Sequence, residues 1–298
     1  MLAIIIPFYK LTFFKATLQS LANQTDKRFK VYIGDDASPE DCNYLISEFK
    51  GYFDFVYHRF DTNLGSISLT QQWERCISLS VDEEWIMILG DDDVLGDNVV
   101  SCFYELEEKL NEQKNNVLKF ASILIDECGK SISKIYSHPI QEKTTEAYYK
   151  HYTGESRSSL SEYIFRRTSY NQFKFTDFPI AWHADDKAWL DFTDCGAVSC
   201  CNEAIIQIRL SSENISGKKD NILLKRKARM LFLEHVIKDK LSHFTYEQKK
   251  VFLFDFGILL KELDAITSKR IVFVFFKFFL MGSFYDSLRF LRRMYWIK

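Results

Sequence analysis

The sequence predicts an α/β protein with an open, mostly parallel sheet flanked by helices, followed by a helical C-terminal extension. First, short apolar runs alternate with segments of helical periodicity through the first half of the chain. Second, 47% of the 298 residues are hydrophobic, enough for one large domain with an appendage or for two domains. Third, the balance of charge changes sign near residue 217, which indicates a separate C-terminal region.

The expected elements follow from these periodicities. Nearly continuous apolar runs, typical of strands buried on both faces of a parallel sheet, predict strands at residues 2–8, 29–36, 53–60 and 84–89. Helical spacing of apolar residues predicts helices around 14–22, over 69–80, and from about Asp97 to Leu110. After the second strand, Ser38 is expected to cap another helix, with Pro39 at its first position.

The charge is divided between two regions of the chain. Residues 217–298 hold 18 Lys+Arg and 8 Asp+Glu, whereas the other 216 residues hold 21 basic and 33 acidic residues. We therefore expect an acidic domain over residues 1–216 and a basic, aromatic-rich helical region over 217–298.

The cysteines and the N-terminus indicate the cytoplasm. The seven cysteines form an odd set without CxxC spacing, which predicts reduced thiols and no structural zinc site. The start, MLAIIIPFYK, lacks a basic segment, a long apolar core and a small-residue cleavage site, so no secretory signal is expected.

Two acidic turns follow predicted strands. Gly-Asp-Asp ends the second strand at residues 34–36, and Gly-Asp-Asp-Asp ends the fourth at 90–93. Adjacent carboxylates repel one another unless they face water or a cation, so each turn could be a solvated turn or half of a metal site. Ligands bind outside the carboxyl ends of the strands in open α/β sheets. Because both turns lie at that edge, we favour the metal site.

Five motifs in order resemble those of the inverting, metal-dependent glycosyltransferases of family 2, which have the GT-A fold. The resemblance covers residues 2–216 and is carried by IIIPFY followed by LQSLANQT (18–25), GDDAS (34–38), NLG (63–65), LGDDD (89–93) and WHADDKAW (182–189). A sixth segment, IRLSSENIS (208–216), is similar to the one that closes the nucleotide-sugar domain. The resemblance implies a hexosyltransferase or related enzyme that uses a nucleotide-sugar donor, most simply a UDP-sugar.

The resemblance also implies roles for particular residues. Asp186, with Asp185 as its alternative, is expected to be the base that deprotonates the acceptor hydroxyl, although a helix N-terminus also favours acids for structural reasons. Asp92 and Asp93 are the expected ligands of Mn²⁺ or Mg²⁺, which prefer oxygen ligands. Residues expected to contact the nucleotide sugar are Pro7, Tyr9, Asp36, Asn63 and Asp91.

Some of these positions have structural alternatives. Asp36 could instead form an Asx turn, Asn63 could cap a turn before Gly65, and Pro7 and Tyr9 could form an ordinary strand end. Contacts to the acceptor or to phosphate are expected from Trp182, His183 and Arg209. The alternative is core packing for Trp182, a structural role for His183 and a salt bridge for Arg209.

The sequence departs from the family pattern in three places. Gly90 replaces the first Asp of the commoner Asp-x-Asp-Asp form, so the motif does not specify which aspartate holds the metal. Trp73-Glu74 lie where Arg-Asn often follow the Asn-x-Gly stretch, and Ser211 replaces a frequent His. The family's contacts to the diphosphate are therefore not transferred to these positions.

The C-terminal segment at residues 270–298 mixes aromatic with basic residues. Its apolar run from Ile271 to Phe284 contains Lys277 and is shorter than the roughly 20 residues of a spanning helix. This pattern favours an interfacial helix on an anionic membrane surface. The alternative is a helical hairpin whose aromatics pack against the catalytic domain or a second subunit. Nucleic acid is a weaker alternative, because no binding motif accompanies the charge.

Two classes of function follow. The first is a glycosyltransferase that extends a lipid-linked saccharide during bacterial surface polysaccharide synthesis, peripheral on the inner face of the cell membrane. The second is a non-catalytic protein of the same fold that acts as a partner in a polysaccharide synthase complex. The two acidic groups favour the enzyme, because a scaffold needs neither. A nucleotidyltransferase is less favoured, because the N-terminal PFYKLTFF contains no glycine for a phosphate loop.

Overall fold

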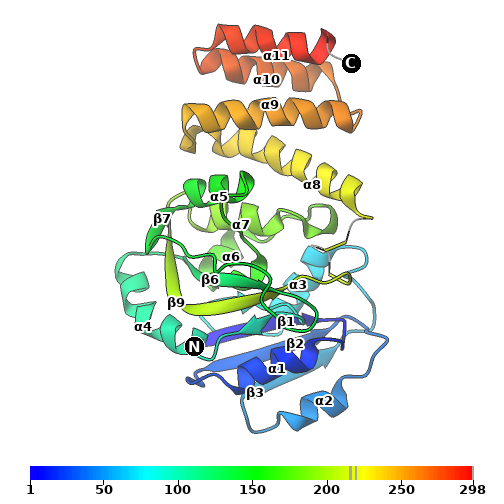
Figure 1. Ribbon diagram of the computed structural model, residues 1–298, viewed down its shortest axis with the longest axis vertical. Helices are drawn as coiled ribbons and strands as arrows, with labels where there is room; N and C mark the ends of the chain where they lie inside the picture. Colours follow the sequence, from blue (N-terminus) through cyan, green and yellow to red (C-terminus); the bar gives the residue numbers. More distant parts are fainter. Residues whose placement is uncertain (215–216, 219, 297–298) are drawn as a thin grey trace. The chain divides into compact units, whose positions relative to one another are not determined.

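The computed structural model describes residues 1–214, 217–218 and 220–296. The chain divides into two compact units (Figure 1). The first comprises residues 1–177 and 184–219, and the second comprises 178–183 and 220–298. The segment 178–183, which includes Trp182 and His183, therefore belongs to the second unit.

A mixed, mostly parallel sheet forms the centre of the first unit, as the sequence predicts. Among the described residues it has nine strands, in the order β3-β2-β1-β4-β8-β6-β9-β5, with β7 also paired to β9. Strands β3, β2, β1 and β4 are mutually parallel, and β8 runs antiparallel between β4 and β6. The strands are β1 (Leu2–Phe8), β2 (Phe29–Asp35), β3 (Asp54–Arg59), β4 (Trp85–Ile88), β5 (Val94–Leu95), β6 (Val117–Ile125), β7 (Gln141–Lys143), β8 (Tyr163–Arg166) and β9 (Ala197–Arg209).

Helices connect the strands of this unit. They are α1 (Phe14–Ala22), α2 (Asn43–Glu48), α3 (Leu69–Ile77), α4 (Val99–Glu112), α5 (Thr144–Tyr152), the 3₁₀ turn η1 (Leu160–Glu162), α6 (Arg167–Phe173) and α7 (Ala184–Phe192).

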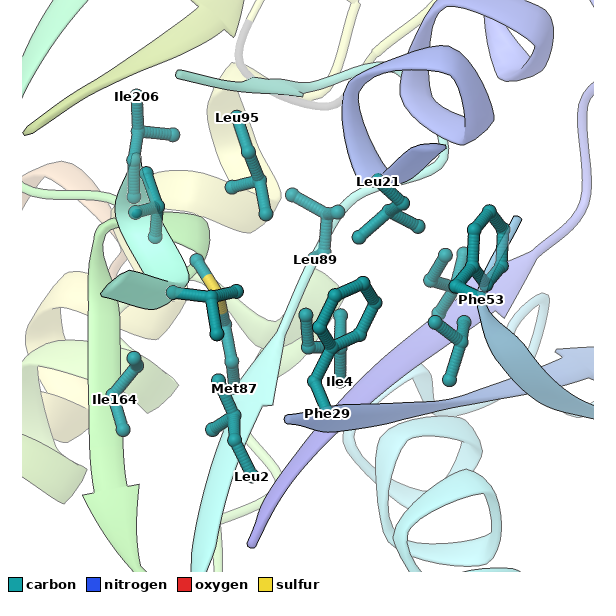
Figure 2. Close-up of a cluster of buried hydrophobic side chains, with 14 of the residues drawn as sticks. Leu2, Ile4, Leu21, Phe29, Phe53, Met87, Leu89, Leu95, Ile164 and Ile206 are labelled. Atoms are coloured by element: carbon teal, nitrogen blue, oxygen red, sulfur yellow. The ribbon is translucent and has the colours of Figure 1, made fainter. Parts of the chain in front are cut away.

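The buried core lies on the sheet face that carries alternate residues of β1. Ile4 packs there with Leu21 of α1 and Met87 of β4 (Figure 2). The opposite face carries Gly34, where an added Cβ would lie 2.3 Å from Cys76 Sγ of α3. Glycine at this position lets α3 pack directly on the sheet.

The predicted helix capped by Ser38 is wrong at its start. Helix α2 begins only at Asn43, with Cys42 as its N-cap. Ser38 forms a turn instead, because its N–H donates to Asp35 Oδ1 (2.8 Å) and its hydroxyl donates to the Tyr9 carbonyl (2.6 Å). These contacts fix the loop after β2 against the end of β1, which leaves Ser38 outside the helix.

The second unit is helical. It contains the turn η2 (Pro179–Ala181), α8 (Ile222–His235), the π-helical turn η3 (Val236–Lys240), η4 (Leu241–His243), α9 (Tyr246–Glu262), α10 (Ser268–Leu280) and α11 (Phe284–Trp296). A capping box of Thr245 and Gln248 starts α9. Helices α10 and α11 form a hairpin on α9. There Phe290 packs so closely that an added Cβ at Gly257 would lie 2.7 Å from its ring. Within the described part of the chain, every helix is too short or too polar to cross a membrane.

Candidate active site at the carboxyl edge of the sheet

The three consecutive aspartates follow β4 at the carboxyl edge of the parallel strands. Asp91 is fixed to the end of β1, because its Oδ2 accepts from the backbone N–H groups of Tyr9 (2.8 Å) and Lys10 (2.9 Å). The two acidic turns thus share one edge, as the topology of a parallel sheet requires. The Asp91 carboxylate binds the backbone N–H groups that follow β1, and not a basic side chain there.

Asp93 is held more completely than its neighbours. Its Oδ2 accepts from the Ser161 hydroxyl of η1 at 2.6 Å, and its Oδ1 accepts from the Arg209 backbone N–H at 2.9 Å. The Ser161 hydroxyl oxygen in turn accepts from the Gly90 N–H at 3.0 Å. Both oxygens of Asp93 therefore have protein donors.

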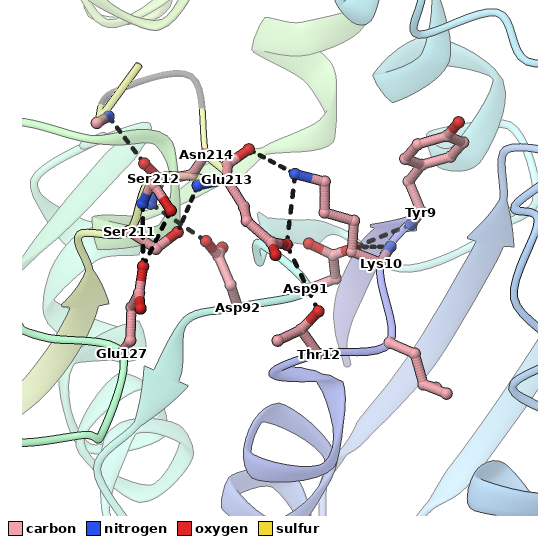
Figure 3. Close-up of polar contacts among 12 residues, drawn as sticks. Tyr9, Lys10, Thr12, Asp91, Asp92, Glu127, Ser211, Ser212, Glu213 and Asn214 are labelled. Atoms are coloured by element: carbon pink, nitrogen blue, oxygen red, sulfur yellow. Dashed lines mark hydrogen bonds and ion pairs between the residues drawn. The ribbon is translucent and has the colours of Figure 1, made fainter. Parts of the chain in front are cut away.

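Asp92 is the least constrained of the three carboxylates. Its Oδ2 accepts one long hydrogen bond, from Asn214 Nδ2 at 3.3 Å, and no bond to its Oδ1 occurs among the described residues. Close by, the Lys10 ammonium donates to the Glu213 carbonyl at 2.5 Å and lies 3.7 Å from the Glu213 carboxylate (Figure 3). The segment after β9 therefore returns to the edge that carries Asp91 and Asp92.

Burial and mutual repulsion make the cluster reluctant to ionise. Burial, followed by the charge of Asp92, raises the pKa of Asp91 to about 7. Burial, followed by the charge of Asp92, likewise raises the pKa of Asp93 to about 7. The pKa of Asp92 is also raised by burial. Such a group of carboxylates is suited to a cation, which would favour their ionised forms.

The second acidic pair lies at the start of α7. Ser161 of η1 contacts Asp93, and the next residue, Glu162, is fully buried, where its carboxylate accepts from Arg157 Nε at 2.9 Å. Burial, followed by the charge of Asp186, raises the pKa of Asp185. Asp185 and Asp186 occupy the first turn of α7.

The two members of the pair have different surroundings. Asp186 is only 5% exposed and lines a small cavity with Tyr148, Tyr163 and Trp189. Its Oδ2 lies 3.8 Å from His151 Nε2. Asp185 is half-buried. The side chain of Asp186 therefore lies within the packed interior of the first unit, whereas Asp185 is the more accessible carboxylate.

Asp36, on the neighbouring acidic turn, is bound to the Asn-x-Gly loop. Its two oxygens accept from the backbone N–H groups of Leu64 (2.7 Å) and Gly65 (2.8 Å). Arg75 of α3 also donates to Asp36 Oδ1 and lies over the Phe60 ring, 3.9 Å from its centroid. These bonds reach a loop 28 and 29 residues away along the chain, so Asp36 does not form the local Asx turn given as its alternative.

The other residues expected at the nucleotide lie along the same edge. Pro7 is half-buried in β1, and Tyr9 is 36% exposed just beyond it. Asn63 Oδ1 accepts from the Ser66 N–H at 2.9 Å, so Asn63 does cap a turn. Arg209 is 4% exposed, and its guanidinium donates to the carbonyls of Asp92 (3.0 Å) and Asp126 (2.6 Å). Arg209 therefore supports the backbone under the aspartate cluster.

Trp182 and His183 belong to the helical unit. The His183 ring stacks on Phe232 of α8, with centroids 5.0 Å apart and planes inclined by 13°. The Lys225 ammonium lies 4.7 Å from the centroid of Trp182. The backbone before α7 is strained, because Ile180 and His183 have φ values of 52° and 69°. Such strain is typical of functional segments.

Several residues that organise the site carry no recognisable sequence signal. Ser161 lies in a serine-rich loop, and Lys10 and Arg75 belong to no motif, while Asn214 lies in the segment IRLSSENIS (208–216) without having been singled out. They contact the aspartates only because distant elements meet at the sheet edge. Ser38 was predicted to cap a helix and instead forms the turn after β2.

Among the described residues, no group of three or more His, Cys, Asp and Glu side chains is arranged to hold a metal ion. Backbone and serine donors hold Asp91 and Asp93. Among the residues that the structure describes, Oδ1 of Asp91 and Oδ1 of Asp92 accept no hydrogen bond from another residue, and Oδ2 of Asp92 accepts one long bond. The oxygens of Asp91 and Asp92 therefore fit an ion that is bound by only one or two carboxylates of the protein.

The mixed sheet and the acidic turns at its carboxyl edge define a glycosyltransferase of the GT-A fold. The chain belongs to glycosyltransferase family 2, since the family described as Glycosyl transferase family 2 matches residues 3–173. No curated protein matches the sequence.

Solved structures of TarS from S. aureus are similar in fold. TarS 1–349 in complex with UDP-GlcNAc gives a TM-score of 0.61 at 12% identity, covering 98% of this chain and 90% of that one. A longer TarS structure gives 0.61 at 13% identity, covering 98% of this chain and 54% of that one. The chain thus spans about half of the longer TarS structure. At these identities the likeness shows the fold alone.

Proposed function

We propose that this glycosyltransferase moves a hexosyl or related sugar, with inversion, from a UDP-sugar to a lipid-linked saccharide during bacterial surface polysaccharide synthesis. The observation that carries the proposal is the cluster of carboxylates Asp91, Asp92 and Asp93 at the carboxyl edge of the sheet. The backbone after β1 holds Asp91 and Ser161 holds Asp93, while Asp92 accepts one long hydrogen bond. The binding of UDP-GlcNAc by the structurally similar TarS supports the choice of a uridine nucleotide.

The proposed cofactor is Mn²⁺ or Mg²⁺. Asp92 is its first proposed ligand, because its Oδ1 is not hydrogen bonded and its Oδ2 has one weak donor. Asp91 could add Oδ1, while Asp93, with both oxygens hydrogen bonded, would position the loop or share the ion more weakly. When bound, such an ion neutralises charge on the diphosphate leaving group.

The proposed base is one carboxylate of the Asp185–Asp186 pair. It would take the proton of the acceptor hydroxyl while the acceptor oxygen bonds to the anomeric carbon and the bond from that carbon to the diphosphate breaks. Motif order favours Asp186, whereas the greater accessibility of Asp185 favours that residue. Burial and the charge of Asp186 raise the pKa of Asp185, which makes its ionised carboxylate a stronger base.

The nucleotide is proposed to bind along the ends of β1 and β2. Pro7 and Tyr9 would line one side, and the loop of Asn63 would form another, with Asp36 holding that loop through Gly65. An added Cβ at Gly65 would lie 2.6 Å from Asp36 Oδ2, so this close approach requires glycine. Trp182 and His183 are proposed acceptor contacts.

A non-catalytic role as a partner in a synthase complex is the alternative. A screen of sugar nucleotides for Mn²⁺-dependent hydrolysis, with and without saccharide acceptors, distinguishes the two. The proposal predicts release of UDP from at least one UDP-sugar and its loss in the Asp92→Asn variant. Absence of hydrolysis and of nucleotide binding across the panel would favour the partner role.

A further inference from the structure

The α10–α11 hairpin has two different faces. Its inner face is packed, because Val274, Phe278 and Phe290 are at most 1% exposed. The Phe278 ring lies 4.9 Å from that of Phe254 on α9, and Phe290 meets Gly257 of the same helix. The aromatic segment therefore forms a hairpin that contributes to the core of the helical unit, with α9 as its partner instead of the catalytic domain or the second subunit named as alternatives.

The outer face remains apolar although it is exposed. On α10, the side chains of Val272, Phe276 and Phe279 are each exposed by just over half and recur at helical spacing opposite the packed residues. Leu280 at the end of α10 is 78% exposed. On α11, the exposed large side chains are Phe284, Tyr285, Leu288 and Tyr295.

The charges on this hairpin are almost entirely positive. Residues 268–296 contain six basic residues and a single acid, Asp286. Asp286 is 4% exposed, accepts from the Ser283 hydroxyl at 2.6 Å and lies 3.7 Å from Lys250 Nζ. The outer surface therefore presents basic side chains and no carboxylate.

The basic residues on the outer face are not neutralised by the protein. Lys269 and Arg292 are exposed, and neither forms an ion pair among the described residues. The Arg289 guanidinium is turned toward α9, where it lies 5.3 Å from the centroid of the Phe254 ring. An apolar face flanked by unpaired cations is complementary to a surface that offers both hydrocarbon and negative charge. A bilayer with anionic headgroups has both properties.

We propose that the outer face of the α10–α11 hairpin binds an anionic membrane surface, with Phe276 and Phe279 inserting beside the headgroups and the basic residues contacting them. Membrane binding would bring the enzyme to a lipid-linked acceptor, which is confined to the membrane. This purpose rests on the proposed function. The basic residues near the surface would add an attraction to the headgroups that salt screens. Insertion of the phenylalanines would supply a share that salt does not remove.

The test uses the full chain and sedimentation with vesicles of phosphatidylglycerol and phosphatidylcholine, compared with phosphatidylcholine alone. The expected result is binding to the mixed vesicles that 0.5 M salt reduces only in part. Replacing Phe276 and Phe279 together by Ser should lower the bound fraction at least fivefold in high salt. Replacing Lys269 and Arg292 by Gln should lower it mainly at low salt.

A matched control replaces Ile222 and Leu223, which are 52% and 67% exposed on α8, by Ser. This variant should bind vesicles as the parent protein does. Far-UV circular dichroism and UDP binding verify that each variant is folded, and UDP binding also separates failure of this proposal from failure of the proposed function. Equal vesicle binding by the phenylalanine variant and the parent would overturn the proposal. Sedimentation velocity tests the other occupant of this face. If the parent forms dimers that the phenylalanine variant does not form, while both bind vesicles equally, the face binds a second copy and the proposal is overturned.

Discussion

The Ser161 hydroxyl donates to Asp93 Oδ2 at 2.6 Å, and both residues are buried. The same hydroxyl oxygen accepts from the Gly90 N–H, so one side chain from η1 closes the turn that carries the three aspartates. Residues 68 positions apart in the sequence thus fix the geometry of the proposed metal site.

Replacing Ser161 by Ala should impair the proposed metal site. The buried Asp93 carboxylate would lose a charge-assisted donor, at a cost of about 1–3 kcal/mol. We expect UDP affinity in Mn²⁺ to fall about tenfold or more, while affinity in EDTA changes little. Ser47→Ala, at an exposed serine on α2, is the control. Equal losses in Mn²⁺ and EDTA would mean that Ser161 supports the fold in general and has no specific role at the cluster.

Replacing Gly90 by Ala should displace the aspartates. The added Cβ would lie 2.9 Å from Asp92 Oδ1, closer than real contacts allow, and 3.0 Å from Asp93 Oδ2, tighter than most real contacts, so both carboxylates would have to move. We expect Mn²⁺-dependent nucleotide affinity to fall at least tenfold, measured by calorimetry. Gly129→Ala provides a control for the addition of a methyl group. An added Cβ at Gly129 meets open space, so the variant strains only its own backbone, at a φ of 79°, and displaces no neighbour. Unchanged affinity in Gly90→Ala would exclude a tightly constrained cluster.

Single substitutions should identify the base. Asn keeps the shape of the aspartate but cannot accept the proton, so the variant of the true base should bind UDP normally and transfer sugar about a hundredfold more slowly or worse. Asp185→Asn and Asp186→Asn are each other's matched control. If both variants retain transfer, the base lies elsewhere. If Asp186→Asn instead unfolds the protein, its buried contacts are structural and Asp185 remains the candidate.

The raised pKa of Asp91 predicts a pH-dependent cost to stability in EDTA. The unfolded carboxyl ionises near 3.8 and the folded one near 7, so the cost is absent below pH 3.8, grows as pH rises, and is complete above about 7. Asp91→Asn removes this cost, which is at most about 1.4 kcal/mol per pH unit. The variant should therefore gain stability relative to the parent between pH 5 and 8, measured by urea unfolding. A constant difference across that range would show that Asp91 titrates normally.

The sequence predicted the features that depend on local pattern. Apolar runs such as residues 2–8 and 29–36 became β1 and β2 with nearly the predicted bounds, because a buried parallel strand needs hydrophobic side chains on both faces. The acidic turn at 90–93 lies at the expected edge for the same topological reason. The fold class was predictable for this reason.

The remaining features depend on long-range contacts. Strand β8 (Tyr163–Arg166) enters the sheet antiparallel between β4 and β6, and four residues carry too little periodicity to reveal this. Ser38 and Pro39 have the composition of a helix start, but Asp35 and Tyr9 draw Ser38 into a turn. The roles of Ser161 and Arg75 follow from where η1 and α3 pack, which no local pattern encodes.

The most direct test of the proposed function is calorimetric titration of UDP into the protein in Mn²⁺ and in EDTA, with the parent chain and the Asp92→Asn variant. If Asp92 holds a cation that binds the diphosphate, the parent should bind UDP at least tenfold more tightly in Mn²⁺. The variant should bind with the same weak affinity in both buffers, while remaining as stable as the parent in EDTA. Equal affinity of the parent in Mn²⁺ and in EDTA would contradict the metal-dependent site at Asp91–Asp93.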